Sequence, residues 1–331
     1  MTLKKALTHP AILIAFPLLV LGVSLFIGRY PRPLFMPPHL LWEDELARRL
    51  VLGLRLPRLL AALLLGSALA ASGTVMQMLF RNPLVEPGFL GVSQGAGFGA
   101  ALSIVLAGSF SAWTQVSAAF FALAALALTY LIARRVHFGG WILRLVLSGI
   151  IVSALFSAGL GILKYLADPA SQLQEIVFWL LGGLYGVTWP RLLGIAPLVL
   201  VGLTVILLMR WRLNLLALGD ETAASLGVSV RRERALLLTI SVAITAAVVS
   251  VAGMVGWIGL IIPHISRRLT GADAAASLPL SIALGGAFAI LCDNLARALT
   301  AGELPLGIIT SLLGALIFLA LMTRPGLQVK P

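Results

Sequence analysis

The sequence predicts an all-helical, polytopic membrane protein with about ten transmembrane helices. Of its 331 residues, 60% are hydrophobic and 11% are charged, whereas about 25% of a typical soluble domain is charged. A span needs roughly 20 mostly apolar residues, and apolar stretches with short connections fill most of the chain. We therefore expect residues 1–331 to form one transmembrane domain without a folded soluble domain.

Charge and cysteine usage exclude several classes of ligand. The formal charge of +12 comes from Lys and Arg at the ends of apolar segments, where basic residues set topology and contact lipid headgroups. No nucleic-acid partner is therefore expected. The single cysteine, Cys292, excludes an internal disulfide and a cysteine-based metal site. We expect this chain to bind no metal and no cofactor.

The expected spans are bounded by basic residues, prolines and glycines. Lys4 and Lys5 place the N-terminus inside, and Arg324 and Lys330 place the C-terminus inside as well. Pro57 occupies a favoured first-turn position of the second span. The ten expected spans are residues 10–28, 57–80, 88–106, 116–133, 142–165, 192–209, 235–252, 256–269, 278–298 and 308–322.

Two polar segments in the first half require an explanation. Residues 81–88 contain Pro83 and Pro87, which end the preceding helix and form a rigid turn. The connection 29–56 lies outside by alternation but is rich in arginine, although basic residues normally collect inside. These arginines require either another topology or a functional reason.

Small residues recur at every fourth position in three of the expected spans. Such faces let helix backbones approach closely within lipid, so they predict a tightly packed bundle, or helices that line a path or a dimer seam. The positions are Ala62, Gly66, Ala70 and Thr74; Gly91, Gly95 and Gly99; and Gly149, Ser153, Ser157 and Gly161.

The second half contains two segments that are not expected to cross the membrane. Residues 172–189 are interrupted by glycines, and broken backbone at membrane depth needs protein or water around it, so we expect a half-helix on the outer side. Residues 213–234 are polar. Within them, Asp220 is expected to cap a short helix that ends at Gly227. Two turns are unstable alone, so this helix must dock through Ala223, Ala224 and Leu226.

Enzymatic and ion-coupled functions find little support in the residues. The four histidines have no partner for nucleophilic catalysis or a metal, and no phosphate-binding G-x-x-x-x-G-K-[ST] loop occurs. Asp293 is the one expected mid-membrane acid, as a proton-coupled carrier would need. It lies four residues before Arg297, so the two are expected to pair across one helical turn.

Six strings in order resemble the permease subunits of vitamin B12, haem and iron-siderophore ABC importers, the FecCD family. They cover the chain nearly end to end. The strings are LRLPR at 54–58, QMLFRNPLVEPGFLG at 77–91, LVLSG at 145–149, LGDETAASLG at 218–227, GWIGLIIPH at 256–264 and ELPLG at 303–307.

The resemblance implies a vitamin B12 permease-like bundle of ten helices that pairs as a homodimer around a central path in a bacterial or archaeal plasma membrane. It implies two ATP-binding partner subunits inside, which hold ATP and Mg²⁺, and a periplasmic or lipoprotein substrate-binding protein outside. The chain would move a ferric siderophore, haem or cobalamin. A secondary transporter is the alternative, and molybdate-type oxyanions remain open as substrates.

The resemblance also assigns roles to residues. Arg55, Arg58 and Arg297 match arginines that face acidic groups on the binding protein, although the family usually has one more residue between Arg297 and the ELPLG turn. The expected gate has Ile142 and Leu143 where the family has small hydroxyl residues, so it would close by dewetting. The full gate is Asn82, Leu84, Ile142 and Leu143, and the ATPase coupling helix comprises Gly219, Asp220, Glu221, Ala223, Ala224, Leu226 and Gly227.

Overall fold

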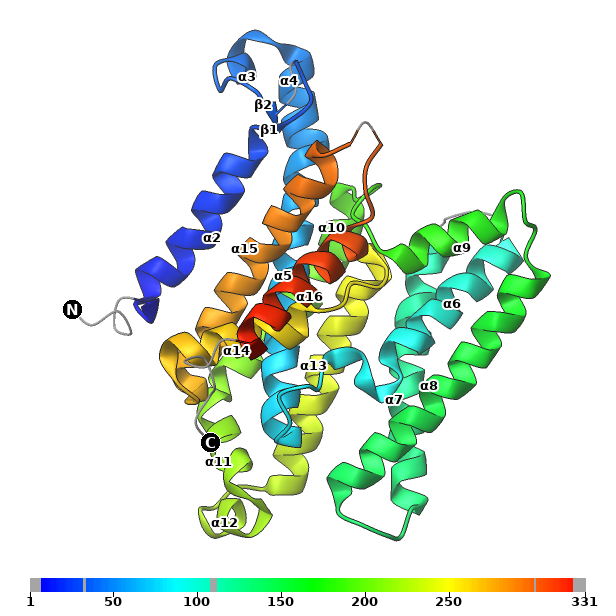
Figure 1. Cartoon of the computed structure of the whole chain (residues 1–331), viewed down its shortest axis with the longest axis vertical. Coiled ribbons are helices and arrows are strands. Elements are labelled where there is room, and N and C mark those ends of the chain that lie inside the picture. The colour runs from blue at the N-terminus through cyan, green and yellow to red at the C-terminus, as the bar shows by residue number, and fades with distance from the viewer. Residues whose placement is uncertain (1–6, 32–33, 108–111, 301, 324–331) are drawn as a thin grey trace.

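The computed structural model describes residues 7–31, 34–107, 112–300 and 302–323 and consists almost entirely of helices (Figure 1). Within these residues, seven helices are long and apolar enough to cross a membrane, and two shorter apolar helices accompany them. The one remaining span, the eighth that we expect (residues 256–269), is a helix of 13 residues, Ile258–Thr270. The predicted all-helical membrane fold is thereby confirmed. The topology signals Lys4, Lys5, Arg324 and Lys330 lie outside the described residues.

The elements follow one another along the chain with short connections. The first half contains α2 (Pro10–Leu25), β1 (Ile27–Gly28), β2 (Leu34–Phe35), α3 (Leu40–Glu43), α4 (Glu45–Arg49), the π-helix η1 (Leu50–Arg55), α5 (Leu56–Phe80), the 3₁₀-helix η2 (Pro87–Leu90), α6 (Val92–Ala107), α7 (Ala112–Arg135) and α8 (Trp141–Leu166). The second half contains α9 (Gln172–Leu181), α10 (Trp189–Leu208), α11 (Arg210–Leu218), α12 (Asp220–Ser225), α13 (Val230–Ala252), α14 (Ile258–Thr270), α15 (Ala274–Ala298) and α16 (Leu306–Thr323).

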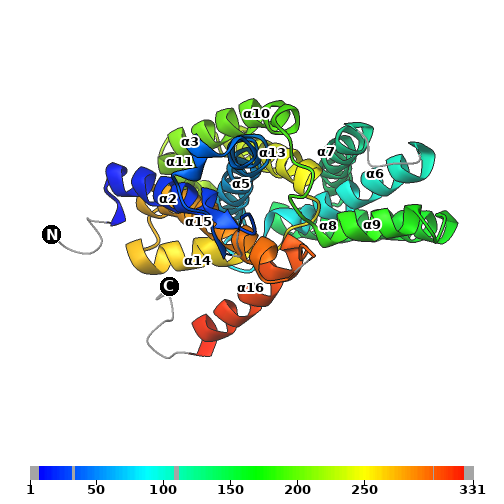
Figure 2. The same cartoon turned by 90° about the horizontal axis from the view of Figure 1, so that it is seen from above.

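Helix α5 is the centre of the bundle, with α10, α13, α14 and α15 packed around it (Figures 1 and 2). Its small-residue face makes this possible. A Cβ atom added to Gly66 would overlap the backbone carbonyl of Gly285 on α15, and one added to Gly73 would overlap the carbonyl of Gly259 on α14. These two glycines therefore let α5 touch its neighbours backbone to backbone.

Helices α6, α7, α8 and α9 form a second group to one side of α5 (Figure 2). A Cβ atom at Gly95 would lie 2.5 Å from the carbonyl oxygen of Phe121, and one at Gly99 would lie 2.5 Å from that of Ser117, both on α7. Gly149 of α8 lies against η2, and Gly91, with φ +82°, lies beside Ser153. Gly91, Gly95, Gly99, Gly149 and Ser153 thus lie where α6, α7, α8 and η2 meet, whereas a Cβ atom at Gly161 would meet nothing within 4 Å.

The start of the second span was predicted wrongly. The helix does not begin at Pro57: it runs without interruption from Glu45 to Phe80 and passes through the wide π turn of η1. There the N–H of Leu56 donates to the carbonyl of Val51. Pro57 has no N–H, so the carbonyl of Leu52 receives no hydrogen bond from it. The indole Nε1 of Trp189 donates to that carbonyl oxygen at 2.9 Å instead. A contact from α10 thus replaces the hydrogen bond that proline lacks.

Other boundaries agree with the sequence or differ by a few residues. The segment 172–189 holds only the ten-residue helix α9, which is too short to span a bilayer, so the expected half-helix is confirmed. Helix α2 ends at Leu25 and not at residue 28, because the chain turns there into the short hairpin of β1 and β2. Helix α5 ends at Phe80, where Arg81 adopts a left-handed conformation with φ +49°.

Candidate functional site

The candidate site residues gather at opposite ends of the bundle. We call the end with Arg55, Arg58 and Arg297 the arginine end, and the opposite end, which carries α12, the α12 end (Figure 1). Between them run the apolar spans, so the two ends lie on opposite sides of a membrane.

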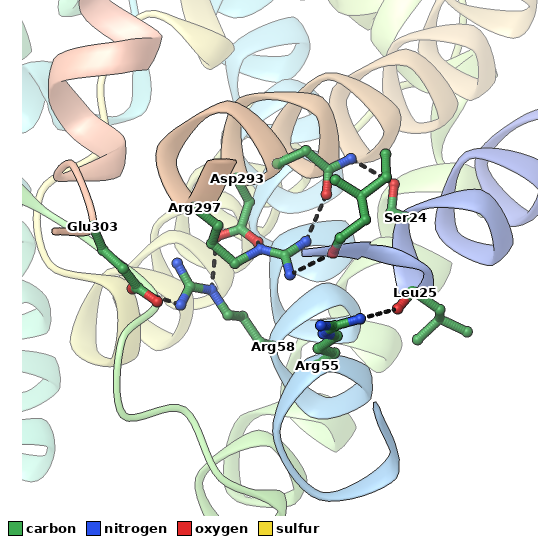
Figure 3. Close-up of polar contacts among 9 residues, drawn as sticks. Ser24, Leu25, Arg55, Arg58, Asp293, Arg297 and Glu303 are labelled. Atoms are coloured by element: carbon green, nitrogen blue, oxygen red, sulfur yellow. Dashed lines mark hydrogen bonds and ion pairs between the residues drawn. The ribbon is translucent and has the colours of Figure 1, made fainter. Parts of the chain in front are cut away.

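A network of buried charges occupies the arginine end (Figure 3). Arg58 Nε lies 2.9 Å from Asp293 Oδ1, and Arg58 Nη1 lies 2.7 Å from Glu303 Oε2. The other carboxylate oxygen of Asp293 lies 2.9 Å from Arg297 Nε. The expected pair of Asp293 and Arg297 is therefore present, but Asp293, whose side chain is 0% exposed, also binds an arginine from α5. One carboxylate thus joins α5 to α15.

The remaining donors of Arg297 bind neighbouring segments. Its Nη2 donates to Asn294 Oδ1 at 2.6 Å, and its Nη1 donates to the carbonyl of Ile27 at 3.3 Å. Asn294 in turn donates to Ser24 Oγ on α2 at 2.7 Å. Arg297, at 9% exposure, is a structural link between α15, α2 and β1.

Arg55 is the least constrained arginine of the three. Its Nη1 donates to the carbonyl of Leu25 at 3.1 Å, and its guanidinium lies directly against Gly28, where any side chain would collide with it. Arg55, Arg58 and Arg297 line a cavity of about 400 Å³ together with Glu303. With more arginine than carboxylate on its walls, this cavity can accept carboxylate groups from outside.

Helix α12 projects from the opposite end between two glycines in left-handed backbone, Gly219 with φ +128° and Gly227 with φ +79°. The glycine at its C-terminal end was predicted. The predicted cap was not correct, because the N-cap is Gly219 and the carboxylate of Asp220 turns instead to Arg234. Arg234 Nη1 and Nη2 donate to its two oxygens at 3.1 and 2.5 Å. These bonds hold the pKa of Asp220 below its usual value.

The apolar residues of α12 divide between two surfaces. Ala223 is 0% exposed and attaches the helix to its own chain, whereas Leu226 is 54% exposed and Ala224 is exposed. A helix of this length is held in place by its anchors. It therefore presents a small apolar surface in a fixed position at the end of the molecule.

Arg234 also reaches the first residue of α8. Its guanidinium lies over the ring of Trp141, 4.0 Å from the centroid, in a cation–π contact. Trp141 directly precedes Ile142 and Leu143, so one side chain touches both the base of α12 and the start of α8. No sequence pattern predicts this contact, because the two residues are 93 positions apart and neither belongs to a periodic pattern.

The expected gate residues lie in two segments at the α12 end, the turn after α5 and the first turn of α8. Asn82 Oδ1 accepts the N–H of Leu84 at 2.9 Å, which holds the turn after α5, and Leu84 is 58% exposed. In the first turn of α8, Leu143 is 44% exposed and Ile142 is half-buried. All four residues are thus close to the surface of the single chain.

Sequence reasoning assigned no role to one half-buried acid, Glu86. It lies in the turn between α5 and η2 and lines a cavity of about 250 Å³ with Leu69 and Gly259. Burial raises its pKa above the usual value, and a hydrogen bond from the backbone of Trp257 opposes that shift. Among the described residues, no three His, Cys, Asp or Glu side chains are grouped as metal ligands.

Comparison with known proteins gives a consistent set of relatives. The FecCD transport family matches residues 14–324. The molybdate import system permease protein of Haemophilus influenzae is 38% identical over 94% of this chain and 95% of its own length. The hemin transport system permease protein of Yersinia pestis is 39% identical over 96% of both chains. A cobalamin import system permease protein of Halobacterium salinarum is 40% identical over 84% of this chain and 74% of its own length.

Solved structures share the architecture. A structure described as an inward-facing conformation of a metal-chelate type ABC transporter matches with a TM-score of 0.87 and 38% identity over 95% of this chain and 99% of that chain. PsaBC from Streptococcus pneumoniae shares the fold with a TM-score of 0.56 at 17% identity, over 87% of this chain and 95% of that one. With a family match from residue 14 to residue 324 and relatives that are named as permeases, this multi-pass membrane protein belongs to the FecCD transport family of ABC permeases.

Proposed function

We propose that this chain is the membrane-spanning permease of an ATP-driven importer for a metal chelate: haem, a ferric siderophore or cobalamin. The observation that carries the proposal is α12, a short helix that is fixed by Asp220 and Arg234 and exposes Ala224 and Leu226. A fixed apolar surface of this size suits a cleft in a partner subunit. The names of the hemin and cobalamin relatives support the substrate class.

In this proposal the α12 end is cytoplasmic, and both termini lie on the cytoplasmic side of the membrane. Two ATP-binding subunits, which hold ATP and Mg²⁺, receive one copy of α12 each. The arginine end then faces the outside of the plasma membrane, where Arg55, Arg58 and Arg297 line a basic cavity. Acidic side chains of a substrate-binding protein would be steered to this cavity by charge. A role in docking thereby explains the excess of outer arginines.

The coupling role predicts the effect of Ala224→Asp. The new carboxylate would be buried without a partner in the ATPase cleft, which lowers the rate of substrate uptake in proteoliposomes by at least about tenfold. Membrane insertion is expected to stay intact, because Ala224 is exposed in this chain.

The matched control is Ala170→Asp, which introduces the same group at another exposed alanine in the loop before α9, away from α12. Uptake by this variant should stay near that of the unchanged protein. If Ala224→Asp transports normally with the ATPase present, the assignment of α12 is wrong.

The transport path requires a second copy of the chain. We place Asn82 and Leu84 at its cytoplasmic gate, with Ile142 and Leu143 as a second, apolar constriction. Cysteines introduced at Asn82 or Leu84 are expected to form a disulfide between two copies in at least one nucleotide state. Background from the native Cys292 is low, since that residue is 1% exposed. If neither cysteine variant forms a disulfide between two copies, with or without nucleotide, the assignment of Asn82 and Leu84 to the gate is wrong.

A molybdate-type oxyanion is the second candidate substrate, favoured by the Haemophilus influenzae relative. The two candidates are separated by uptake assays with the cognate binding protein, in which haem, a ferric siderophore, cobalamin and molybdate are offered separately. Metal chelates should be taken up and molybdate should not. Uptake of molybdate alone would replace the first candidate with the second.

A further inference from the structure

A second basic cavity, of about 530 Å³, opens at the α12 end. Its walls come from the last turns of α7, the first turns of α8 and α13, and α12. Four arginines line it, and Asp220 is the carboxylate among its lining residues. Asp220 is already bound by Arg234. The lining arginines are Arg134, Arg144, Arg231 and Arg234.

Most of this positive charge is not neutralised by the protein. Among the residues that the structure describes, neither Arg134 nor Arg231 forms an ion pair, and both are exposed. Arg144 donates its Nε to the carbonyls of Gly139 and Phe138 at 3.0 and 3.4 Å, and these contacts carry no countercharge. The cavity therefore lacks counter-anions for three guanidinium groups.

The position of the cavity in the chain sets its depth in a membrane. Helices α7, α8 and α13 are all long and apolar enough to span a bilayer, and the cavity lies where all three end. Two aromatic residues with polar edges, Tyr130 and Trp141, line it beside the arginines. Aromatic and basic residues collect in this way at the boundary between lipid tails and headgroups. The rest of the wall is apolar and includes Ala133, Leu145 and Val230.

We propose that this cavity binds an anionic phospholipid. Arg134, Arg144 and Arg231 would bind the headgroup phosphate, since guanidinium groups pair well with phosphate oxygens. The apolar wall would hold the upper part of an acyl chain. Basic pockets between helices at the cytoplasmic boundary are suited to such headgroups. The bound lipid would connect the start of α8 to α12, beside the contact that Arg234 makes with both.

The test uses the full-length chain purified in detergent and titrated with phosphatidylglycerol, with binding followed by native mass spectrometry. The double variant Arg134→Gln/Arg231→Gln removes two headgroup contacts. It is expected to weaken binding by about 30-fold, at roughly fivefold for each arginine near a membrane surface.

The matched control is Arg135→Gln/Arg232→Gln. These arginines are exposed neighbours on the same two helices and do not line the cavity, so the net charge changes equally. Binding by the control should change by less than about twofold. Equal losses in both double variants would show diffuse attraction to the surface and overturn the proposal, as would no loss in either.

A second variant separates a lipid from a free anion. Ala133→Phe fills the apolar wall without changing charge and should also abolish retention of phosphatidylglycerol. Inorganic phosphate and phosphatidylcholine should bind far more weakly than phosphatidylglycerol. If inorganic phosphate binds the unchanged chain as tightly as the lipid does, the site recognises a free anion and the proposal is overturned. If Ala133→Phe retains phosphatidylglycerol, the apolar wall does not hold an acyl chain, which also overturns the proposed lipid site.

Discussion

The two ends of the molecule use the same chemistry in opposite surroundings. At each end an arginine binds an aspartate: Arg58 binds Asp293, and Arg234 binds Asp220. Both arginine side chains are similarly buried, at 11% and 9% exposure. The carboxylates differ, since the side chain of Asp293 is 0% exposed and that of Asp220 is 54% exposed.

This difference in exposure means that the ion pair of Arg58 and Asp293 is costly to break, whereas that of Arg234 and Asp220 can be broken at lower cost. If Asp293 were lost, the buried Arg297 would keep its charge without its carboxylate partner, and Arg58 would retain only the partly exposed Glu303, which is costly in a low-dielectric site. If Asp220 turned away from Arg234, water would solvate it at little cost. The arginine end is therefore built as a fixed frame, whereas the contact between α12 and Arg234 can change while the protein works.

The largest effect is expected from Asp293→Ala. It leaves Arg58 and Arg297 without the carboxylate that they share and should lower the free energy of unfolding by about 3–5 kcal/mol. Chemical unfolding in detergent measures this quantity. The control is Glu303→Gln, because Glu303 binds Arg58 from a side chain that is 44% exposed. This substitution should lower the free energy of unfolding by less than about 1 kcal/mol. Similar losses for both variants would abolish the distinction between a buried and an exposed partner.

A smaller effect is expected from Arg234→Gln. This substitution removes both the pair with Asp220 and the contact with Trp141, and the loss should be about 1–2 kcal/mol. Comparison with Trp141→Leu, Asp220→Asn and the double variants gives the coupling energy of each contact. If Arg234→Gln costs as much as Asp293→Ala, the α12 end is as rigid as the arginine end.

The smallest effect concerns pH. The pKa of Asp220 is lowered in the folded state by hydrogen bonds from Arg234. The contribution of Asp220 to the free energy of unfolding is therefore complete above its pKa in the unfolded chain, about 3.9, and is lost as the pH falls through its lower pKa in the folded protein. Solvent screening limits it to less than about 1 kcal/mol. The difference in melting temperature between the unchanged protein and Asp220→Asn should therefore shrink on acidification. Glu221→Gln, which removes a charge from the same turn, serves as control, and a difference that grows in acid would contradict the assignment.

Local sequence patterns predicted those features of the fold, such as helix ends, that depend on residues a few positions apart. The helix that ends before Pro83, the short α9 and the glycine at the end of α12 all follow from backbone preferences within a few positions. The small-residue face around Gly66 predicted close packing, because only small side chains permit it. It did not predict that the partner would be Gly285.

Contacts between distant segments could not be predicted in this way. Asp220 has the ideal sequence context of a helix cap, yet an arginine 14 positions later binds both of its oxygens. Arg58 pairs with a residue 235 positions away. In both cases the fold supplied a stronger partner than the local backbone, and only the three-dimensional arrangement shows which charged groups meet.

The π turn of η1 has a consequence for orientation. A π turn holds one residue more than an α turn, and one residue corresponds to about 100° of rotation around a helix axis. Removing Gly53, which has no neighbour in reach of a Cβ atom, would turn α4 by about that angle relative to Arg58. A single inserted residue, which leaves no trace in composition or hydropathy, thus sets the direction in which α4 faces.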